Sequence, residues 1–173
     1  MPELQPLRAS HAQAVLAFEL ANRGYFAGFI SDRGDDFFEQ FTERHQAMLA
    51  EQEAGHCAYY VLADEDGSVV GRFNLYDIKD GMAVLGYRVA QHVAGRGVAT
   101  AAVRELCQLA AARHGLHMLK AATTRDNVPS QKVLTKAGFV PVGPGDIAGK
   151  PGIWYRRDLT SADVEQGQPP RTG

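Results

Sequence analysis

The amino-acid sequence predicts an α+β (α/β) fold, with about four helices packed on the faces of a mixed, mostly antiparallel sheet of about seven strands. Two observations lead to this prediction. Segments with the apolar spacing of helices lie before and after a central run with the two-residue alternation of strands. Turn signals divide that run into hairpins. The 173 residues suffice for one domain, assigned to residues 1–160, followed by a disordered polar tail over 161–173.

The chain begins with an edge strand and a helix. Residues 4–7 are predicted to form the strand. Ser10 lies three residues before Gln13, which is the spacing of a capping box at a helix start. Apolar residues then recur at helical spacing, so the first helix is predicted over residues 11–21.

An aromatic loop separates this helix from a second one. The loop, residues 22–34, carries large apolar side chains among glycines, and it either fills the core or lines a pocket. The second helix is predicted over residues 35–54, because Asp35 and Asp36 favour a helix start. His45 on its apolar face is interpreted as a partly buried surface histidine rather than a ligand.

The middle of the chain is predicted to form an antiparallel meander. Strand-like alternation begins at residues 56–63. Asp66 with the following glycine is a hairpin signal, and residues 69–77 form the partner strand. A second turn leads to a strand over residues 82–89.

Helices and strands alternate in the last part of the chain. A helix predicted over residues 98–114 leads to a strand over 116–123. The next helix begins at Asn127, a residue that suits a helix cap. A final strand pair is predicted over residues 139–142 and 153–159, joined by a long loop rich in Gly and Pro.

Composition excludes several classes of protein. The net charge of -2 gives no reason to expect nucleic-acid binding. No apolar run approaches the ~18–20 residues of a membrane span, and the first residues lack the pattern of a secretory signal. Cys57 and Cys107 are interpreted as reduced core residues, and their spacing does not predict a metal site. We therefore expect a cytoplasmic protein with no metal and no membrane or nucleic-acid partner.

The segment 93–100 predicts an anion-binding corner between a strand and a helix. Gly95 and Gly97 flank Arg96 and let the backbone approach a ligand closely. The first N–H groups of the following helix are free, and its dipole favours an anion. The alternative is a turn that needs glycine for its geometry alone. A P-loop nucleotide enzyme is excluded, because no Lys-Ser/Thr pair follows the glycines.

The order of elements and three motifs resemble the GNAT superfamily of N-acetyltransferases over about residues 4–159. Gly86-Tyr87-Arg88-Val89 and Gly95-Arg96-Gly97-Val98-Ala99-Thr100 follow its strand and pyrophosphate-loop pattern. Asn127-Val128-Pro129-Ser130 and Lys136-Ala137-Gly138-Phe139 follow its Asn-x-x-Ser…Lys-x-Gly-Phe pattern. Within the superfamily, the chain looks most like the RimJ/RimL branch, which acetylates the N-terminal amines of ribosomal proteins.

The resemblance implies an N-acetyltransferase that uses acetyl-CoA as acyl donor. Pyrophosphate would bind the backbone amides of the loop, and the pantetheine arm would pair with the strand before it. The superfamily has Gln or Arg where this chain has Ala94, which leaves the cradle to the backbone. Arg96 either adds a charged contact or is a solvated loop cation. The expected cofactor-binding residues are Tyr87, Arg88, Val89, Ala94, Gly95, Arg96, Gly97, Val98, Ala99, Thr100, Asn127 and Ser130.

The resemblance also suggests catalytic groups. Many members protonate the departing thiolate with a tyrosine, but Leu134 occupies that position here. The close branch uses the serine of Asn-x-x-Ser, so Ser130 is the candidate proton donor; the alternative is that Ser130 only caps its helix. For the base, Asp146 is the nearest match to the branch's glutamate, with His92 or water relayed through Tyr87 as alternatives. An N-terminal amine has a pKa near ~8, so direct attack by its neutral fraction needs no strong base.

The acceptor is expected to be a primary amine, either a peptide N-terminus or a small molecule such as an antibiotic or polyamine. Its pocket is expected to involve the first helix and the aromatic loop. An extended acidic groove would favour polyamines or aminoglycosides, and Asp32, Asp35 and Asp36 form a modest acidic cluster. The expected assembly is a monomer or homodimer. The alternative function is a non-catalytic acyl-CoA sensor with the same fold.

Overall fold

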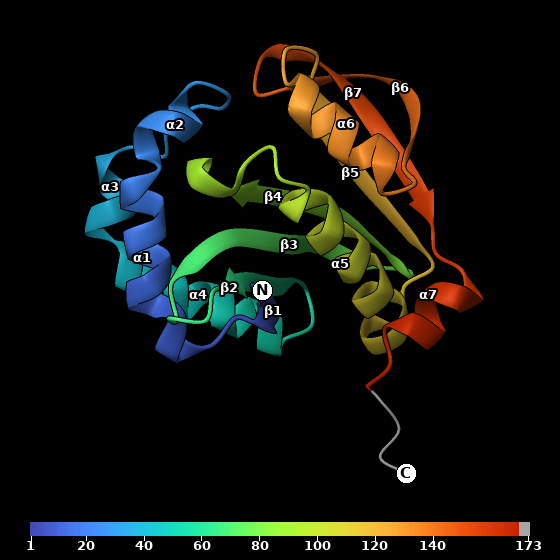
Figure 1. Cartoon of the computed structure of the whole chain (residues 1–173), viewed down its shortest axis with the longest axis horizontal. Coiled ribbons are helices and arrows are strands. Elements are labelled where there is room, and N and C mark those ends of the chain that lie inside the picture. The colour runs from blue at the N-terminus through green and yellow to red at the C-terminus, as the bar shows by residue number, and fades with distance from the viewer. Residues whose placement is uncertain (170–173) are drawn as a thin grey trace.

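The computed structural model describes residues 1–169, and in these residues seven strands form a sheet in the order β1-β2-β3-β4-β5-β7-β6 (Figure 1). Neighbouring strands are antiparallel except β4 and β5, which are parallel. The strands are β1 (Glu3–Pro6), β2 (Ala58–Ala63), β3 (Val69–Lys79), β4 (Met82–Val89), β5 (Met118–Thr124), β6 (Val140–Ile147) and β7 (Lys150–Asp158). The predicted mixed, mostly antiparallel sheet is confirmed.

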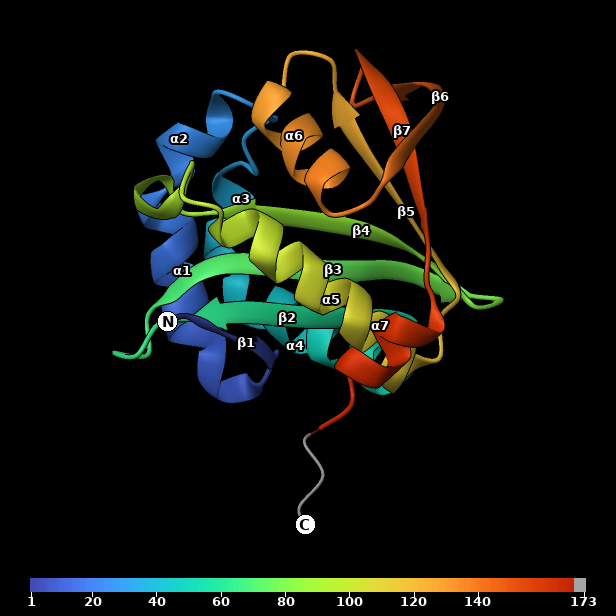
Figure 2. The same ribbon diagram turned by 45° about the vertical axis from the view of Figure 1, so that its right-hand side comes forward.

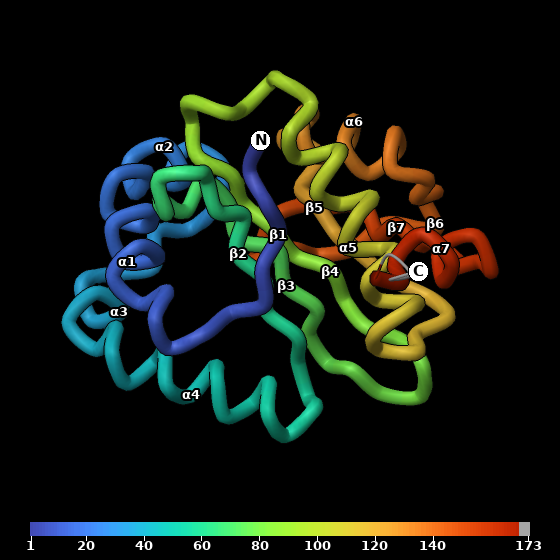
Figure 3. Tube along the Cα trace, turned by 60° about the horizontal axis from the view of Figure 1, so that its bottom comes forward, coloured from blue at the N-terminus to red at the C-terminus, as the bar shows by residue number. Residues whose placement is uncertain are grey.

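Helices cover both faces of the sheet (Figure 3). Helices α1 to α4 lie on one side and α5 to α7 on the other. The helices are α1 (Ala12–Ala21), α2 (Arg23–Ala27), α3 (Asp35–Glu39), α4 (Phe41–Glu53), α5 (Val98–His114), α6 (Val128–Lys136) and α7 (Ser161–Gln166). Among the described residues, no helix combines the length and apolarity needed to cross a membrane.

The side chains of strand β2 pack on both faces of the sheet. Its side chains alternate, so Tyr60 and Leu62 join the core beneath α5. Tyr59 and Val61 join the second core, which is rich in phenylalanine and lies beneath α1 and α4. All six residues of β2 are buried, as expected for a strand covered on both faces.

The N-terminal half contains more helices than its sequence predicts. Helix α2 lies within the aromatic segment that was expected to be irregular. Asn22 separates it from α1, because its side-chain amide donates to the Phe18 carbonyl at 2.9 Å and competes with the helical backbone. The single helix predicted over residues 35–54 is divided at Gln40, whose backbone (φ -99°, ψ 17°) leaves helical geometry.

The long loop predicted between the last two strands is wrong. Strands β6 and β7 continue to Ile147 and from Lys150, so they form a hairpin with a two-residue turn. Ala148 and Gly149 both have positive φ, 52° and 82°, as tight hairpin turns require. The prediction of a loop relied on the Gly and Pro content of this segment. Pairing with β7 stabilises the strand conformation of β6 despite that composition.

The disorder predicted for residues 161–173 is wrong for residues 161–166, which form α7. Thr160 and Asp163 form a capping box at its start. The Asp163 carboxylate is buried and accepts a hydrogen bond from Arg157 at 3.0 Å. Gly167 then packs against α5, where an added Cβ would lie 2.1 Å from the Gln108 carbonyl oxygen. The part of this prediction that concerns residues 170–173 lies outside the described residues.

Candidate active site

Strands β4 and β5 pair only at one end and then diverge (Figure 2). Their parallel register runs from Met82 opposite Met118 to Leu85 opposite Ala121. Residues 86–89 continue to pair with β3 alone, and β5 continues with β7. The backbone edge of residues 86–89 therefore faces the opening between the strands, where an extended chain can pair with it.

The glycine corner lies at this opening and begins α5. Gly95 and Gly97 have φ values of 75° and 78°, a region that other L-residues adopt at a cost, so both glycines are needed for the turn. Gly97 caps the helix, and the first intrahelical bond runs from the Ala101 amide to the Gly97 carbonyl at 3.1 Å. The amides of residues 98–100 precede that bond and belong to the free first turn. This geometry fits the phosphate groups of an acyl-CoA.

A cavity of about 390 Å³ connects the corner, the edge of β4, helix α6 and the aromatic segment. Ten of the residues predicted to bind the cofactor line it: Tyr87, Arg88, Val89, Ala94, Gly95, Gly97, Ala99, Thr100, Asn127 and Ser130. Arg96 and Val98, the other two, are not part of the lining. The structure thus brings Tyr87 and Ser130, which lie 43 positions apart in the sequence, into one cavity.

Ser130 and Tyr87 meet inside the cavity. The Tyr87 hydroxyl donates to Ser130 Oγ at 3.2 Å, and its ring stacks on Phe73 with centroids 5.5 Å apart. Burial raises the pKa of Tyr87, against a smaller opposing effect of its bond to Ser130, so the phenol stays protonated and remains a donor. Because the phenol occupies a lone pair of Ser130, the serine proton is free to reach another acceptor.

Asn127 holds the start of α6. Its side-chain oxygen accepts a hydrogen bond from the Ser130 amide at 3.3 Å, so the capping role considered for this turn is present, but it belongs to Asn127. The Ser130 side chain is left for its contact with Tyr87. Leu134, one turn later, is buried in the core at 1% exposure and cannot transfer a proton.

The structure does not bring Asp146 to the cavity. Its carboxylate accepts a hydrogen bond from the Gly149 amide at 2.7 Å and closes the β6–β7 turn. The segment was predicted to be a long loop, but it forms a hairpin that holds Asp146 at an exposed turn. His92, the other side chain considered as a base, is exposed and also absent from the lining.

Several lining residues were not predicted. On α6 they include Lys132 and Lys136, whose four-residue spacing places two cations on one helix face. This spacing is visible in the sequence, so the presence of two cations on one face of α6 could have been predicted from it. The remaining unpredicted residues of this helix are Val128, Pro129 and Val133.

The aromatic segment does both things that its sequence allowed. Tyr25, Phe26, Phe29 and Ile30 line the cavity. Phe26 is also buried in the second core and packs edge-on against Phe18, with centroids 5.5 Å apart. Core packing thus holds one wall of the cavity in place.

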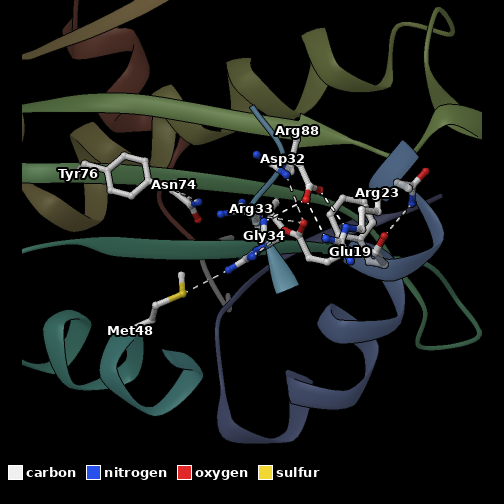
Figure 4. Close-up of polar contacts among 12 residues, drawn as sticks. Glu19, Arg23, Asp32, Arg33, Gly34, Met48, Asn74, Tyr76 and Arg88 are labelled. Carbon is white, nitrogen blue, oxygen red and sulfur yellow. Dashed lines mark hydrogen bonds and ion pairs between the residues drawn. The ribbon is translucent and has the colours of Figure 1, made fainter. Parts of the chain in front are cut away.

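A buried ionic cluster lies beside this wall (Figure 4). Arg72 on β3 and Arg88 on β4 are directly opposite each other, an arrangement that repels like charges. Glu19 of α1 relieves this repulsion, because one carboxylate oxygen accepts from Arg72 at 2.8 Å and the other from Arg88 at 3.2 Å. Arg33 adds a third contact to Glu19, also at 3.2 Å.

Glu19 remains ionised although its side chain is 1% exposed. Burial alone would raise its pKa, but the attraction of Arg33, Arg88 and Arg72 outweighs burial and lowers the pKa below the ordinary value of 4.5. The sequence indicated only a helical position for Glu19. In the sequence, Arg72 and Asn74 alternate with apolar residues in one strand, and this pattern could have indicated buried polar contacts on one face of the sheet.

In the acidic cluster predicted near the second helix, two of the three carboxylates are paired with one arginine. Arg23 donates to Asp32 at 2.9 and 2.8 Å and to Asp35 at 2.8 Å. Its hydrogen bonds lower the pKa of Asp32 to about 2. The predicted acidic groups Asp32, Asp35 and Asp36 are all absent from the cavity lining.

Comparison with known proteins identifies relatives of this architecture. Residues 3–140 match the family described as acetyltransferase (GNAT) domain. The Bacillus subtilis (strain 168) protein named Probable N-acetyltransferase YjcK is 30% identical over 145 residues, which cover 79% of this chain and 78% of that protein.

Two solved structures share the fold. The ribosomal-protein-S5-alanine acetyltransferase of Vibrio fischeri superposes with a TM-score of 0.86 at 20% identity, covering 92% of this chain and 94% of that chain. Mycobacterium smegmatis RimJ, solved in complex with CoA-disulfide, gives a TM-score of 0.81 at 23% identity, covering 94% and 86%.

Proposed function

The chain belongs to the acetyltransferase (GNAT) domain family and is an N-acetyltransferase of that type; we propose that it transfers the acetyl group of acetyl-CoA to a primary amine, of a peptide N-terminus or a small molecule, by direct attack on the thioester. The observation that carries the proposal is the single cavity joining the open edge of β4, the start of α5 and the Ser130–Tyr87 pair. The structure of RimJ with a CoA-disulfide supports CoA as the carrier.

In this proposal, backbone groups bind the acyl donor. The amides of residues 95–100 and the α5 dipole stabilise the pyrophosphate. The free edge of residues 87–89 pairs with the pantetheine arm, and the amide near Val89 donates to the thioester oxygen as negative charge develops there. Ala94 contributes no side-chain contact, so affinity depends on the backbone geometry that the two glycines allow.

The chemical step needs one proton transfer to the sulfur. The neutral amine attacks the thioester carbon, a C–N bond forms, the C–S bond breaks, and the amine loses one proton to solvent. Ser130 donates a hydrogen bond or a proton to the departing thiolate; where it gives the proton, it regains one from solvent, which has taken up the proton of the amine. Tyr87 holds the serine with its proton directed into the cavity. Asp146 has no part in the step, and attack by the neutral fraction of the amine needs no strong base.

Turnover of acetyl-CoA with a panel of amines tests the proposal. We expect free CoA thiol and an acetylated product, detected by a thiol reagent and by mass spectrometry, for at least one of N-terminal peptides, free amino acids, aminoglycosides and spermidine. Tight CoA binding without thiol release for every amine would contradict it and favour the acyl-CoA sensor.

A further inference from the structure

The wall of the cavity is positively charged. Its lining contains three cations, Arg88, Lys132 and Lys136, and no Asp or Glu among the residues that the structure describes. Lys132 and Lys136 lie on α6, on the side of the cavity that also carries Ser130. Arg88 lies on the opposite side, with the aromatic segment. A protonated amine that enters the cavity therefore meets the positive charge of Arg88 on the side opposite α6.

The charge of Arg88 is only partly compensated. Three arginines share the single carboxylate of Glu19. Arg88 gives Glu19 one hydrogen bond, at 3.2 Å from Nη1, although a guanidinium carries five N–H groups. Its side chain is 17% exposed, and it lines both this cavity and a smaller pocket that it shares with Asp32 and Arg33.

The surroundings of Arg88 favour binding of an anion. Its guanidinium carbon lies 4.6 Å from the centroid of Phe26, which fixes the plane of the group against the aromatic wall. Burial and the repulsion of Arg33 and Arg72, partly offset by Glu19 and Tyr76, lower the pKa of Arg88 to about 10. A second carboxylate beside Arg88 would relieve that repulsion. Nearby Asp32 and Asp35 are already paired with Arg23.

We propose that Arg88 binds a carboxylate of the acceptor, so that the preferred substrates are primary amines that also carry a carboxylate, rather than polyamines. The α-carboxylate of a free amino acid and an acidic side chain near a peptide N-terminus both supply this group. A planar guanidinium suits a carboxylate because it donates two parallel hydrogen bonds. This inference rests on the proposed acetyltransferase function and names the acceptor class of the same site.

Matched acceptor pairs test the inference with the whole chain and acetyl-CoA. The first pair is alanine and alaninamide, and the second is amidated peptides that begin Ala-Glu and Ala-Gln; spermidine represents the polyamines. We expect kcat/KM, calculated on the neutral fraction of each amine, to be at least about tenfold higher for the carboxylate member of one pair, as a hydrogen-bonded charge predicts. Preference in the first pair assigns an α-carboxylate, and preference in the second an acidic side chain. Equal rates within both pairs, or spermidine as the best acceptor, would overturn the inference while leaving acetyl transfer established.

Variants of Arg88 assign the preference to that side chain. In Arg88→Gln we expect KM for the preferred carboxylate acceptor to rise about tenfold or more, while KM for its amide partner changes less than about twofold. Arg88→Lys keeps the charge and should recover part of the preference. The matched control is Arg156→Gln, which removes an exposed arginine on β7. Circular dichroism and the urea midpoint of Arg88→Gln report whether the variant is folded. An unchanged ratio in a folded Arg88→Gln would overturn the assignment, whereas no turnover by the wild type with any of these acceptors would contradict the proposed acetyl transfer to such amines rather than the role of Arg88.

Discussion

The two sides of the cavity are built on different principles. The side formed by the glycine corner and the edge of β4 presents backbone groups, and its geometry depends on two glycines within three residues. The side formed by the aromatic segment and Arg88 presents side chains that a buried ionic cluster holds in place. A backbone site needs only a local turn and a helix start. A side-chain site needs partners from several elements.

This contrast has a consequence for specificity. A backbone cradle recognises phosphate groups in any related chain that keeps the turn, so it suits a donor that the family shares. A side chain on the wall of a cavity can be replaced without changing the sheet that carries it. The acceptor side is therefore where we expect this chain to differ in function from proteins of the same fold.

The largest expected effect concerns the backbone side. Gly97→Glu should raise the Kd for CoA by about 1,000-fold, measured by titration calorimetry. A carboxylate about 4 Å from the pyrophosphate costs about 4 kcal/mol at an effective dielectric constant near 20. No neighbouring atom lies within 4 Å of a Cβ added at Gly97, so a steric clash is not the cause.

Gly97→Asn is the control for this substitution, because asparagine tolerates positive φ and adds no charge. We expect it to lose much less affinity than Gly97→Glu. Equal losses in the two variants would mean that strain rather than charge is responsible, and retained affinity in Gly97→Glu would remove the corner from the donor site.

The second-largest effect is expected in the ionic cluster, on the side of the cavity formed by the aromatic segment and Arg88. Glu19→Gln leaves Arg72 and Arg88 opposed without a buried counter-charge, so the free energy of unfolding should fall by about 3 kcal/mol in urea denaturation. Glu43→Gln, an exposed glutamate on α4, is the control and should change stability by less than about 0.5 kcal/mol. A loss no larger than that of the control would show that Glu19 does not hold the cluster.

The same cluster predicts a pH dependence. The pKa of Glu19 is lowered in the folded state, so its stabilisation is present above the ordinary value of 4.5 and is lost as the pH falls through the folded-state pKa. The acid limb of a plot of unfolding free energy against pH should therefore be shallower in Glu19→Gln than in the wild type. Parallel acid limbs would contradict the prediction.

The contrast between the two sides also explains what the sequence could predict. The corner is encoded by neighbouring residues, so its position and its turn at the start of α5 follow from a short pattern, and its role as an anion site stays a prediction. Glu19 finds its partners 53 and 69 positions along the chain, in Arg72 and Arg88, and only the register of β3 with β4 brings these together. Local spacing does not show which distant residues pair in this way, so the ionic cluster was not predicted. The aromatic segment, in contrast, was expected to take part in the acceptor pocket, and Tyr25, Phe26 and Phe29 line the cavity.

A smaller effect is expected where the two sides meet. Ser130→Ala should lower kcat by about 100-fold and change KM for acetyl-CoA by less than about threefold, because the hydroxyl acts on the departing thiolate. Tyr87→Phe keeps the ring that stacks on Phe73 and removes only the bond to Ser130, so kcat should fall by about tenfold. Steady-state kinetics measures both, and a pure KM effect in Ser130→Ala would assign the serine to binding instead.

The smallest expected effect separates the cavity from the hairpin beside it. Asp146→Ala should leave kcat within about twofold of the wild type, because the carboxylate is not part of the cavity lining. It should lower stability by about 1 kcal/mol, because the Gly149 amide loses its 2.7 Å hydrogen bond in a turn where Ala148 already has positive φ. Asp146→Asn, which keeps an acceptor oxygen, should recover most of that stability. A fall in kcat of about 100-fold in both variants, with stability intact, would instead make Asp146 the base and require the hairpin to move toward the site during turnover.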